Sequence, residues 1–306
     1  MKVLLQNVLI LLILAGAQPV HAEDKFFDSN GVQIRYVTAG EGEPVVLIHG
    51  WMSSSAMWGS DWAGNTKLDT KDSKGFLLIA IDCRGHGKSD KPHDATKYGA
   101  EMAADVVRLL DHLKLKKAHL IGYSAGAFIA AKVAATHPDR VLSIVYGGQA
   151  PLIAEPKSRD FAEAKPKPNA SSEVEIFARA VDEGKDLGSY LIAVMPPGRP
   201  KPTPEEAKAL AAFLYGGKDL KAFALAGRSF DELEVDGAQL KKCTAPVLFI
   251  HGSNEVASTK TRVAAVRKLL GHGEIKVVEG ADHVSTLGKP EFGKAIVDFI
   301  HANKQK

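Results

Sequence analysis

Apolar residues along the chain fall into short continuous runs that alternate with longer stretches of helical spacing. A short, almost wholly apolar run is typical of a strand that is buried on both faces of a parallel sheet. Four such runs occupy residues 45–48, 76–81, 118–121 and 141–146. Residues 101–113 instead place Met102, Val106 and Leu109 on one face of a helix. The order of these elements predicts an α/β fold with a doubly wound, mostly parallel sheet.

Further strands and helices are predicted on both sides of this central part. Residues 25–29 and 32–38 are strand-like, and Asn30-Gly31 between them favours a tight hairpin turn. A helix over residues 128–135 is expected to end before Pro138, whose ring disfavours its continuation. Strands are predicted again at 246–250 and 275–279, and helices at 259–270 and 290–302.

The pattern changes between residues 150 and 242, where buried strand-like runs are absent. Helical segments are predicted there at 174–181, 204–215 and 220–226, between loops rich in proline and lysine such as 165–168 and 196–202. We interpret residues 150–242 as a helical lid inserted into an α/β core. The core is then formed by residues 23–149 and 243–306.

The first 22 residues differ from the rest of the chain. Lys2 precedes an almost wholly apolar run over residues 3–17, and Val20-His21-Ala22 has small residues at the two positions that a signal peptidase reads. These features predict a secretory signal peptide over residues 1–22, cleaved before Glu23. The alternative is an uncleaved anchor helix, for which the apolar run is short. We therefore expect an exported protein, periplasmic or secreted, without stable membrane insertion after cleavage.

Composition narrows the possible partners. The 306-residue chain has 39 basic and 36 acidic side chains and a net charge of +3, which is too balanced to suggest a nucleic-acid partner. Its two cysteines, Cys83 and Cys243, are predicted to lie at opposite edges of the sheet, so we expect two free, buried thiols. No Cys/His cluster has the spacing of a metal site, and no metal or cofactor is predicted. The sequence does not indicate an oligomeric state.

The candidate chemistry begins with Gly122-Tyr123-Ser124-Ala125-Gly126, which lies between a predicted strand and a predicted helix. This arrangement matches the G-x-S-x-G nucleophile elbow, in which a sharp turn lifts the serine hydroxyl clear of the sheet. Small residues must flank the strained turn, as Gly122 and Gly126 do. Alone the motif is weak, because the glycines could serve close packing around an idle serine.

A serine nucleophile requires a base and a third group that orients the base. His283 is the predicted base, because it lies in a glycine-rich loop just after a late strand. Glu255 is the predicted acid, since it follows the preceding strand, although aspartate is commoner at this place. Asp231 and Asp282 are the rival acids: Asp231 falls in the return from the lid, and Asp282 adjoins His283 and would point away.

An oxyanion formed at Ser124 needs two N–H donors. One predicted donor is the amide of Ala125, at the start of the helix after the serine. The other is the amide of Trp51, in the loop after the first buried strand, where Gly50 allows close approach of the backbone. The ring of Trp51 either lines the acyl pocket or packs under the lid, and the ring of Tyr123 either lines the pocket or belongs to the core. His49 is interpreted as a residue that shapes this loop.

Four motifs together resemble the α/β-hydrolase superfamily, and specifically its lidded serine esterase and haloperoxidase-like branch. They are His49-Gly50-Trp51, Asp82-Cys83-Arg84-Gly85-His86-Gly87-Lys88-Ser89, Gly122-Tyr123-Ser124-Ala125-Gly126 and Gly280-Ala281-Asp282-His283. The resemblance covers residues 26–303 except the lid. It implies that Asp82 and Arg84 are a loop-holding pair and not catalysts. Epoxide hydrolases and haloalkane dehalogenases of this fold use aspartate at the elbow, so Ser124 makes both activities unexpected.

These residues predict a serine hydrolase that cleaves a small carboxylic ester or lactone through an acyl-enzyme on Ser124. A serine C–C bond hydrolase and a cofactor-free perhydrolase are alternatives within the same fold. A non-catalytic protein that binds a small ligand is the alternative from a different class. The fold hosts many chemistries, so the identity of the substrate does not follow from the motifs.

Overall fold

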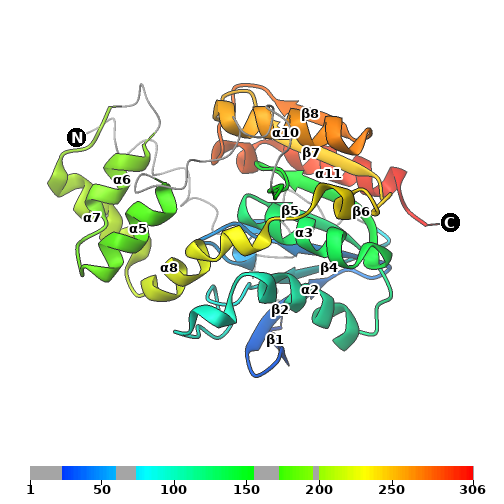
Figure 1. Ribbon diagram of the computed structural model, residues 1–306, viewed down its shortest axis with the longest axis horizontal. Helices are drawn as coiled ribbons and strands as arrows, with labels where there is room; N and C mark the ends of the chain where they lie inside the picture. Colours follow the sequence, from blue (N-terminus) through cyan, green and yellow to red (C-terminus); the bar gives the residue numbers. More distant parts are fainter. Residues whose placement is uncertain (1–22, 60–73, 155–171, 196–199, 306) are drawn as a thin grey trace, which may run out of the picture.

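The computed structural model describes residues 23–59, 74–154, 172–195 and 200–305. These residues form an eight-stranded sheet in the order β1-β2-β4-β3-β5-β6-β7-β8, flanked by helices (Figure 1). Strands β1 and β2 are antiparallel, β2 pairs antiparallel with β4, and all other pairs are parallel. The strands are β1 Lys25–Asp28, β2 Gln33–Ala39, β3 Glu43–Ile48, β4 Phe76–Ile81, β5 Ala118–Tyr123, β6 Val141–Gly147, β7 Val247–Gly252 and β8 Glu274–Val278. The predicted mostly parallel α/β sheet is confirmed.

The predicted hairpin between β1 and β2 is present. Asn30 and Gly31 both have positive φ, at 60° and 79°, which is the backbone that a two-residue primed turn needs. The amide of Ser29 donates to the carbonyl oxygen of Val32 over 2.8 Å and closes the turn. The local sequence alone therefore accounts for this connection.

Helices cover the two faces of the sheet. Side chains of α2, α3 and α10 join the buried cluster on one face, whereas α11 packs on the other. Strand β3 shows why its run is continuously apolar: Val46 and Ile48 enter the first cluster, and Val45 and Leu47 enter the second. The helices are α2 Ala100–His112, α3 Ala125–Thr136, α10 Ala257–Leu270 and α11 Pro290–Ala302.

A group of helices is inserted between β6 and β7 and lies beside the sheet in Figure 1. These inserted helices are α5 Glu173–Asp182, α6 Gly188–Val194, α7 Pro204–Tyr215 and α8 Leu220–Arg228, and the short α9 Gly237–Leu240 follows them before β7. The four longer helices pack together. They have a small aromatic core of their own, in which Phe177 contacts Tyr190 and Tyr215. The boundaries given for the lid, residues 150–242, stay a prediction, and the predicted loop over 165–168 lies outside the described residues.

The start of α7 shows how the local sequence determines where one of these helices begins. Thr203 accepts a hydrogen bond from the amide of Glu206, and the Glu206 carboxylate accepts one from the amide of Thr203. This capping box, with Pro204 in the first helical turn, fixes the start of the helix as predicted. Helix α6 was not predicted, because its seven residues begin with glycine and have no capping side chain.

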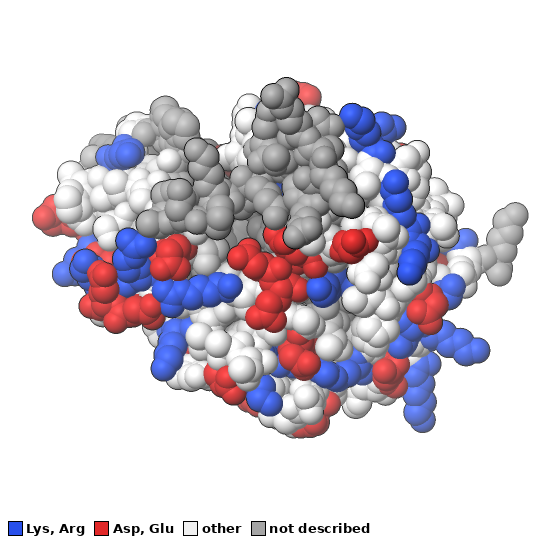
Figure 2. All heavy atoms as spheres, in the orientation of Figure 1, with Lys and Arg blue, Asp and Glu red and all other residues white. Residues whose placement is uncertain are grey.

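The predicted signal peptide, residues 1–22, lies outside the described residues. Just after it, Asp24 forms ion pairs with Arg35 and Lys88. In the described part of the chain, no helix is both long and apolar enough to cross a membrane. Basic and acidic side chains are interspersed over the face drawn in Figure 2. Cys83 and Cys243 are both free and buried, which confirms that expectation.

Candidate active site

The candidate site lies at the carboxyl edge of the sheet, where the loops after four parallel strands meet. The loop after β3 provides Gly50 and Trp51, β5 leads directly into Ser124, and the loops after β7 and β8 provide Glu255 and His283. Since β3, β5, β6, β7 and β8 are parallel, these loops all leave the sheet on the same edge. This edge is where open α/β sheets bind their ligands.

Ser124 occupies a strained turn between β5 and α3. Its φ and ψ are 55° and −121°, a backbone conformation that residues other than glycine rarely adopt. The turn is tight: a Cβ on Gly122 would lie 2.2 Å from the carbonyl oxygen of Gly126, and one on Gly126 would lie 2.2 Å from that of Ile48. Only glycine fits at these two places, which gives the G-x-S-x-G pattern its physical basis.

The structure brings Ser124, His283 and Glu255 into one hydrogen-bonded chain. Nε2 of His283 lies 3.0 Å from Oγ of Ser124, and Nδ1 lies 2.9 Å from Oε2 of Glu255. A carboxylate only accepts hydrogen bonds, so the neutral imidazole carries its proton on Nδ1. Nε2 is then the acceptor for the serine hydroxyl. This is the arrangement that a general base and its orienting acid require.

The Glu255 carboxylate is almost completely buried, with a side-chain exposure of 2%. Its second oxygen, Oε1, accepts a hydrogen bond of 3.0 Å from the amide of Val256. The loops after β7 and β8 are joined by a hydrogen bond from the backbone amide of Asn254 to the carbonyl oxygen of Ala281. The same carbonyl lies so close to Gly252 that a side chain there would not fit. These contacts hold Glu255 and His283 in register.

The two rival acids are placed elsewhere. Oδ1 of Asp282 accepts hydrogen bonds from the amides of Val284 and Ser285, so it organises the turn after His283. Asp231 lies in the short 3₁₀ helix Phe230–Leu233 and is exposed. Of the three carboxylates considered from the sequence, Glu255 is the one hydrogen-bonded to His283.

His49 fixes the backbone of the loop after β3. Its Nε2 accepts a hydrogen bond from the amide of Cys83, so the ring proton is on Nδ1, which donates to the carbonyl oxygen of Gly50 over 2.7 Å. Burial lowers the pKa of His49, which keeps the ring neutral. The amide of Ser53 donates to the same carbonyl. In a trans peptide, C=O and N–H point in opposite directions, so the Trp51 amide points away from His49.

The amides of Trp51 and Ala125 flank Ser124 from two sides. A Cβ on Gly50 would lie 3.1 Å from Cβ of Ser124, which shows how closely the loop approaches the serine. Within the described residues, neither amide has a hydrogen-bond acceptor. Ala125 begins α3, where unpaired N–H groups favour negative charge. The pair has the chemistry of an oxyanion hole, and its catalytic role stays a prediction.

The Trp51 ring joins the site to the inserted helices. Its indole Nε1 donates to the carbonyl of Phe223 in α8 over 2.8 Å. The ring also makes edge contacts with Phe177 of α5 and Phe230, at centroid distances of 5.3 and 5.9 Å. The ring thus packs beneath the inserted helices, the second of the two possibilities considered for it.

Tyr123, next to the serine, supports the histidine loop from below. It is buried, its ring lies 5.4 Å from the imidazole of His283, and its hydroxyl donates to the carbonyl oxygen of His283. Gly148 passes so close that a Cβ there would lie 3.0 Å from Cε1 of His283. Sequence reasoning treated Tyr123 as a pocket wall or a core residue and missed this contact.

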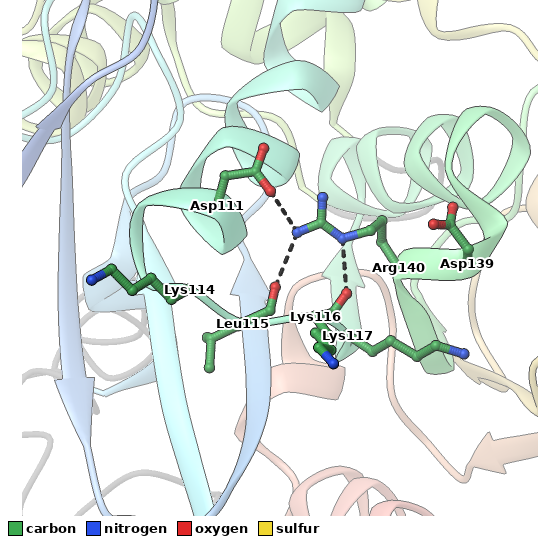
Figure 3. Close-up of a pocket in the computed structure, with 7 residues that line it drawn as sticks. All are labelled: Asp111, Lys114, Leu115, Lys116, Lys117, Asp139 and Arg140. Carbon is green, nitrogen blue, oxygen red and sulfur yellow. Dashed lines mark hydrogen bonds and ion pairs between the residues drawn. The ribbon is translucent and has the colours of Figure 1, made fainter.

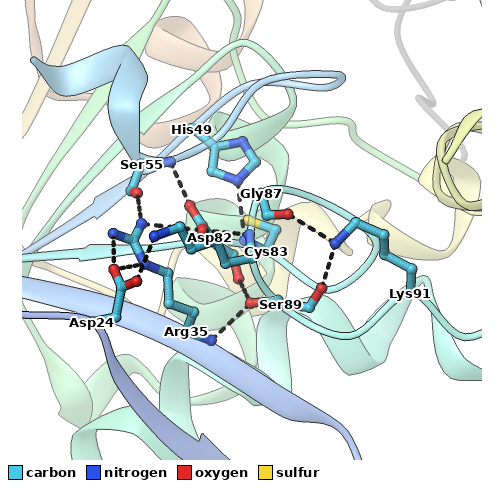
Figure 4. A network of polar contacts seen from close by, with 10 residues as sticks. Asp24, Arg35, His49, Ser55, Asp82, Cys83, Gly87, Ser89 and Lys91 are labelled. Atoms are coloured by element: carbon cyan, nitrogen blue, oxygen red, sulfur yellow. Dashed lines mark hydrogen bonds and ion pairs between the residues drawn. The ribbon is translucent and has the colours of Figure 1, made fainter. Parts of the chain in front are cut away.

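The prediction that Asp82 and Arg84 form a pair is wrong. Asp82 accepts hydrogen bonds from the amides of Ser55 and Lys88 and pairs with Arg35 of β2 at 3.2 Å (Figure 4). Arg84 instead pairs with Asp105 of α2 at 2.6 Å, and both side chains are buried. Each residue does hold a loop, but with its own partner, because Asp82 faces β2 and Arg84 faces α2.

An open surface pocket of about 560 Å³ lies at the opposite edge of the sheet, before β5 and β6. Its single arginine, Arg140, is occupied by Asp111 and by the carbonyl oxygens of Leu115 and Lys116 (Figure 3). The side chains of Lys114 and Lys117 extend outward in the same view. This pocket is remote from Ser124 and offers no converging groups.

A second carboxylate near the site was not predicted from the sequence. Glu173, at the start of α5, lies close enough to feel the charges of both His283 and Glu255. Burial raises the pKa of Glu173, and Glu255 adds to the rise while His283 opposes it. Among the described residues, no cluster of His, Cys, Asp or Glu is suited to a metal ion.

Most of the chain matches a known protein family. The sequence model of the alpha/beta hydrolase fold family matches residues 43–290. The chain belongs to the α/β-hydrolase fold family. This confirms the fold and the superfamily resemblance, and the coarse assignment is a hydrolase of this fold.

Relatives of this α/β-hydrolase carry different activities in their names. It is 30% identical over 92% of its length to a 2-(acetamidomethylene)succinate hydrolase of Mesorhizobium japonicum, covering 96% of that protein. It is 38% identical to a putative 2-succinyl-6-hydroxy-2,4-cyclohexadiene-1-carboxylate synthase of Bacillus subtilis over 39% of its length, but spans only 42% of that protein. A bromoperoxidase structure from Bacillus anthracis, 24% identical, superposes with a TM-score of 0.71 over 91% of this chain and all of the other, and it shows the fold alone.

Proposed function

We propose that this α/β-hydrolase is a serine hydrolase that cleaves a small carboxylic ester or lactone through an acyl-enzyme on Ser124. The observation that carries the proposal is the continuous hydrogen-bonded path from Oγ of Ser124 through His283 to the buried carboxylate of Glu255. A serine held in a strained turn and joined to a correctly oriented imidazole is equipped for nucleophilic attack.

The residues support the following reaction. Nε2 of His283 takes the proton of Ser124 as Oγ attacks the carbonyl carbon, and the Glu255 carboxylate stabilises the imidazolium that forms. The amides of Trp51 and Ala125 donate to the oxyanion, a contribution of roughly 3 kcal/mol for each donor. The imidazolium then gives its proton to the leaving alcohol. Water, deprotonated by His283, releases the acyl group and restores Ser124.

Ester cleavage is favoured over epoxide opening because the elbow residue is serine. Where this family opens epoxides, the resemblance implies an aspartate at the elbow. The same machinery would serve a serine C–C bond hydrolase or a perhydrolase, which remain alternatives. A second candidate is hydrolysis of an amide-bearing dicarboxylate, favoured by the relative from Mesorhizobium japonicum, whose name states such a substrate and which aligns over 92% of this chain.

The test is turnover of p-nitrophenyl acetate and p-nitrophenyl butyrate by the purified protein and by Ser124→Ala. We expect the substitution to reduce kcat by at least about 10⁴-fold. Equal rates for the two proteins would contradict a nucleophilic Ser124. Absence of turnover by the wild type, on these esters and on a panel of lactones and amides, would favour the non-catalytic ligand-binding protein.

The identity of the acid is tested with Glu255→Ala and Asp231→Ala in parallel. We expect Glu255→Ala to reduce kcat by about 10² to 10⁴-fold and Asp231→Ala to change it less than about two-fold. A larger loss in Asp231→Ala would overturn the assignment of Glu255.

We also propose that the protein is exported and processed before Glu23. The apolar run over residues 3–17 and the small residues at Val20 and Ala22 support this proposal. Mass spectrometry of the protein expressed with its full sequence should give a mature chain that begins at Glu23. A chain that retains residues 1–22 and sediments with membranes would favour the anchor alternative.

A further inference from the structure

Glu173 is placed at the candidate site by the packing of α5. A Cβ on Gly227 of α8 would lie 2.9 Å from both Cζ2 of Trp51 and Cγ1 of Val174. The first turn of α5 therefore sits against the ring of the tryptophan whose amide is the proposed oxyanion donor. Phe177, one turn later, contacts the same ring. Glu173, adjacent to Val174, is thus held over the loop that carries Trp51.

The Glu173 carboxylate lies within range of the charges of the site and has no bonded counter-charge among the described residues. It interacts electrostatically with His283, with Glu255 and with Tyr190 of α6. Within the described residues it makes no hydrogen bond or ion pair, and its side chain stays accessible to solvent. Enough protein surrounds the carboxyl group for burial to raise its pKa. A carboxylate in this state has unused capacity to interact with a ligand.

The next glutamate along the helix shows the contrast. Glu175 forms an ion pair with Arg228 at 3.2 Å, and its charge is balanced at the surface of the inserted helices. Glu173 and Glu175 carry the same formal charge on the same helical turn, but His283 is among the main charges acting on Glu173, whereas Arg228 dominates at Glu175. The site therefore has two negative groups: Glu255, which is buried and hydrogen-bonded to the imidazole, and Glu173, which acts on it through its charge.

We propose that Glu173 is a specificity residue whose negative charge favours esters with a cationic group over esters with a carboxylate group. This proposal rests on the ester-hydrolase function proposed above. A fixed charge attracts an opposite charge and repels a like charge in the bound substrate, and across a partly solvated site each effect amounts to about five- to ten-fold. The proposal disfavours the dicarboxylate considered above as a natural substrate.

The experiment uses three p-nitrophenyl esters of equal chain length whose acyl groups end in trimethylammonium, tert-butyl or carboxylate. The first two end groups have the same shape and differ in charge. Because burial raises the pKa of Glu173, the assays are run at about pH 8, well above the ordinary glutamate value of roughly 4.3. For the wild type we expect kcat/KM to fall from the cationic to the neutral to the anionic ester.

Glu173→Gln should lower kcat/KM for the cationic ester and raise it for the anionic ester by about five- to ten-fold each. The neutral ester should change less than about two-fold. Glu173→Asp should retain the wild-type order, because it keeps the charge. Glu175→Gln is the matched control: it removes the same charge from the same turn and should leave all three ratios unchanged. Identical ratios in wild type and Glu173→Gln would overturn the proposal.

Failure of the proposed function would be distinguishable from failure of this inference. If Ser124→Ala hydrolyses the neutral ester as fast as the wild type, the ester function at this site is wrong. Calorimetry then measures the affinity for alkylboronic acids with the same three end groups, and it reports the charge order without turnover. Retention of the cationic preference in binding, and its loss in Glu173→Gln, would sustain the role of Glu173; equal affinities would reject it.

Discussion

The hydroxyl group of Tyr123 donates a hydrogen bond to the backbone carbonyl oxygen of His283. The residue before the proposed nucleophile thus supports the proposed base, although 160 positions separate them in the sequence. The Tyr123 ring is itself held by an edge contact with Phe292 of α11 at 5.5 Å. The separation between Oγ of Ser124 and Nε2 of His283 therefore depends on a contact below the site.

Tyr123→Phe tests this dependence. The substitution removes the hydroxyl and keeps the ring, so we expect kcat for p-nitrophenyl butyrate to fall about five- to ten-fold with little change in KM, the equivalent of one hydrogen bond. Tyr146→Phe is a matched control, because the buried hydroxyl of Tyr146 has no hydrogen-bond partner in the described structure. An equal loss of kcat in both variants would refute a specific role for Tyr123.

His49→Ala should damage the proposed oxyanion hole. Without the hydrogen bond from Nδ1 to the carbonyl of Gly50, the peptide that orients the Trp51 amide loses a fixed partner. We expect kcat to fall about 10- to 100-fold while KM stays within about three-fold, because the oxyanion forms only after attack. His49→Asn, which can still donate to Gly50, should recover part of kcat. A rise in KM with constant kcat would contradict this role.

Asp82→Asn should destabilise the protein and change its response to acid. Burial raises the pKa of Asp82, but the amides of Lys88 and Ser55 outweigh it, so the folded-state pKa lies below the usual value of 3.8. A depressed pKa contributes stability above about pH 4 that is lost as the pH falls through the folded-state value. We expect Asp82→Asn to lower the free energy of unfolding by about 2–4 kcal/mol at pH 7.

The measurement is urea unfolding of both proteins at pH 7 and at pH 3. The difference between wild type and Asp82→Asn should shrink at the lower pH, because below about pH 4 Asp82 of the unfolded wild type takes up a proton and the stability that its depressed pKa contributes begins to be lost. Asp298→Asn is the control, since Asp298 is exposed and, among the described residues, pairs with Lys294 of the same helix alone. A difference between Asp82→Asn and wild type that grows on acidification would reverse the sign argued here.

Gly126→Ala tests the packing of the elbow. The new methyl group would lie 2.2 Å from the carbonyl oxygen of Ile48, a backbone atom that cannot move without distorting β3. We expect a loss of more than about 3 kcal/mol in unfolding free energy, or insoluble protein. Gly237→Ala should be tolerated, because its nearest neighbour is the flexible Leu269 side chain at 3.1 Å. A melting temperature of Gly126→Ala within about 2 °C of wild type would contradict the close contact.

The positions of the main candidate residues at the carboxyl edge of the sheet could be predicted from the sequence. The elbow, the base and the acid each follow a strand whose buried run is legible, so Ser124, Glu255 and His283 could be placed at one edge from topology alone. Glu255 could be preferred to Asp282 because Asp282 adjoins His283 in the sequence and was expected to point away from the imidazole. Asp282 does accept hydrogen bonds from the amides of Val284 and Ser285.

Contacts between distant segments escaped prediction. The partner of Asp82 is Arg35, 47 positions earlier, and no local pattern distinguishes it from Arg84. Glu173 is one of two glutamates in the first turn of α5, and the periodicity of that helix does not tell which of them faces the site. Helix α6 was missed because short helices depend on tertiary packing more than on local signals.

Trp51 has a consequence for exchanging parts between family members. Its backbone amide belongs to the proposed oxyanion hole, and its indole Nε1 donates a hydrogen bond to the backbone carbonyl oxygen of Phe223 in α8. A chimaera that receives its inserted helices from another hydrolase keeps that anchor only where a backbone carbonyl lies at the same place, so a displaced α8 should change turnover number as well as substrate range. Modular recombination of this enzyme therefore has to transfer the tryptophan and its acceptor as one unit.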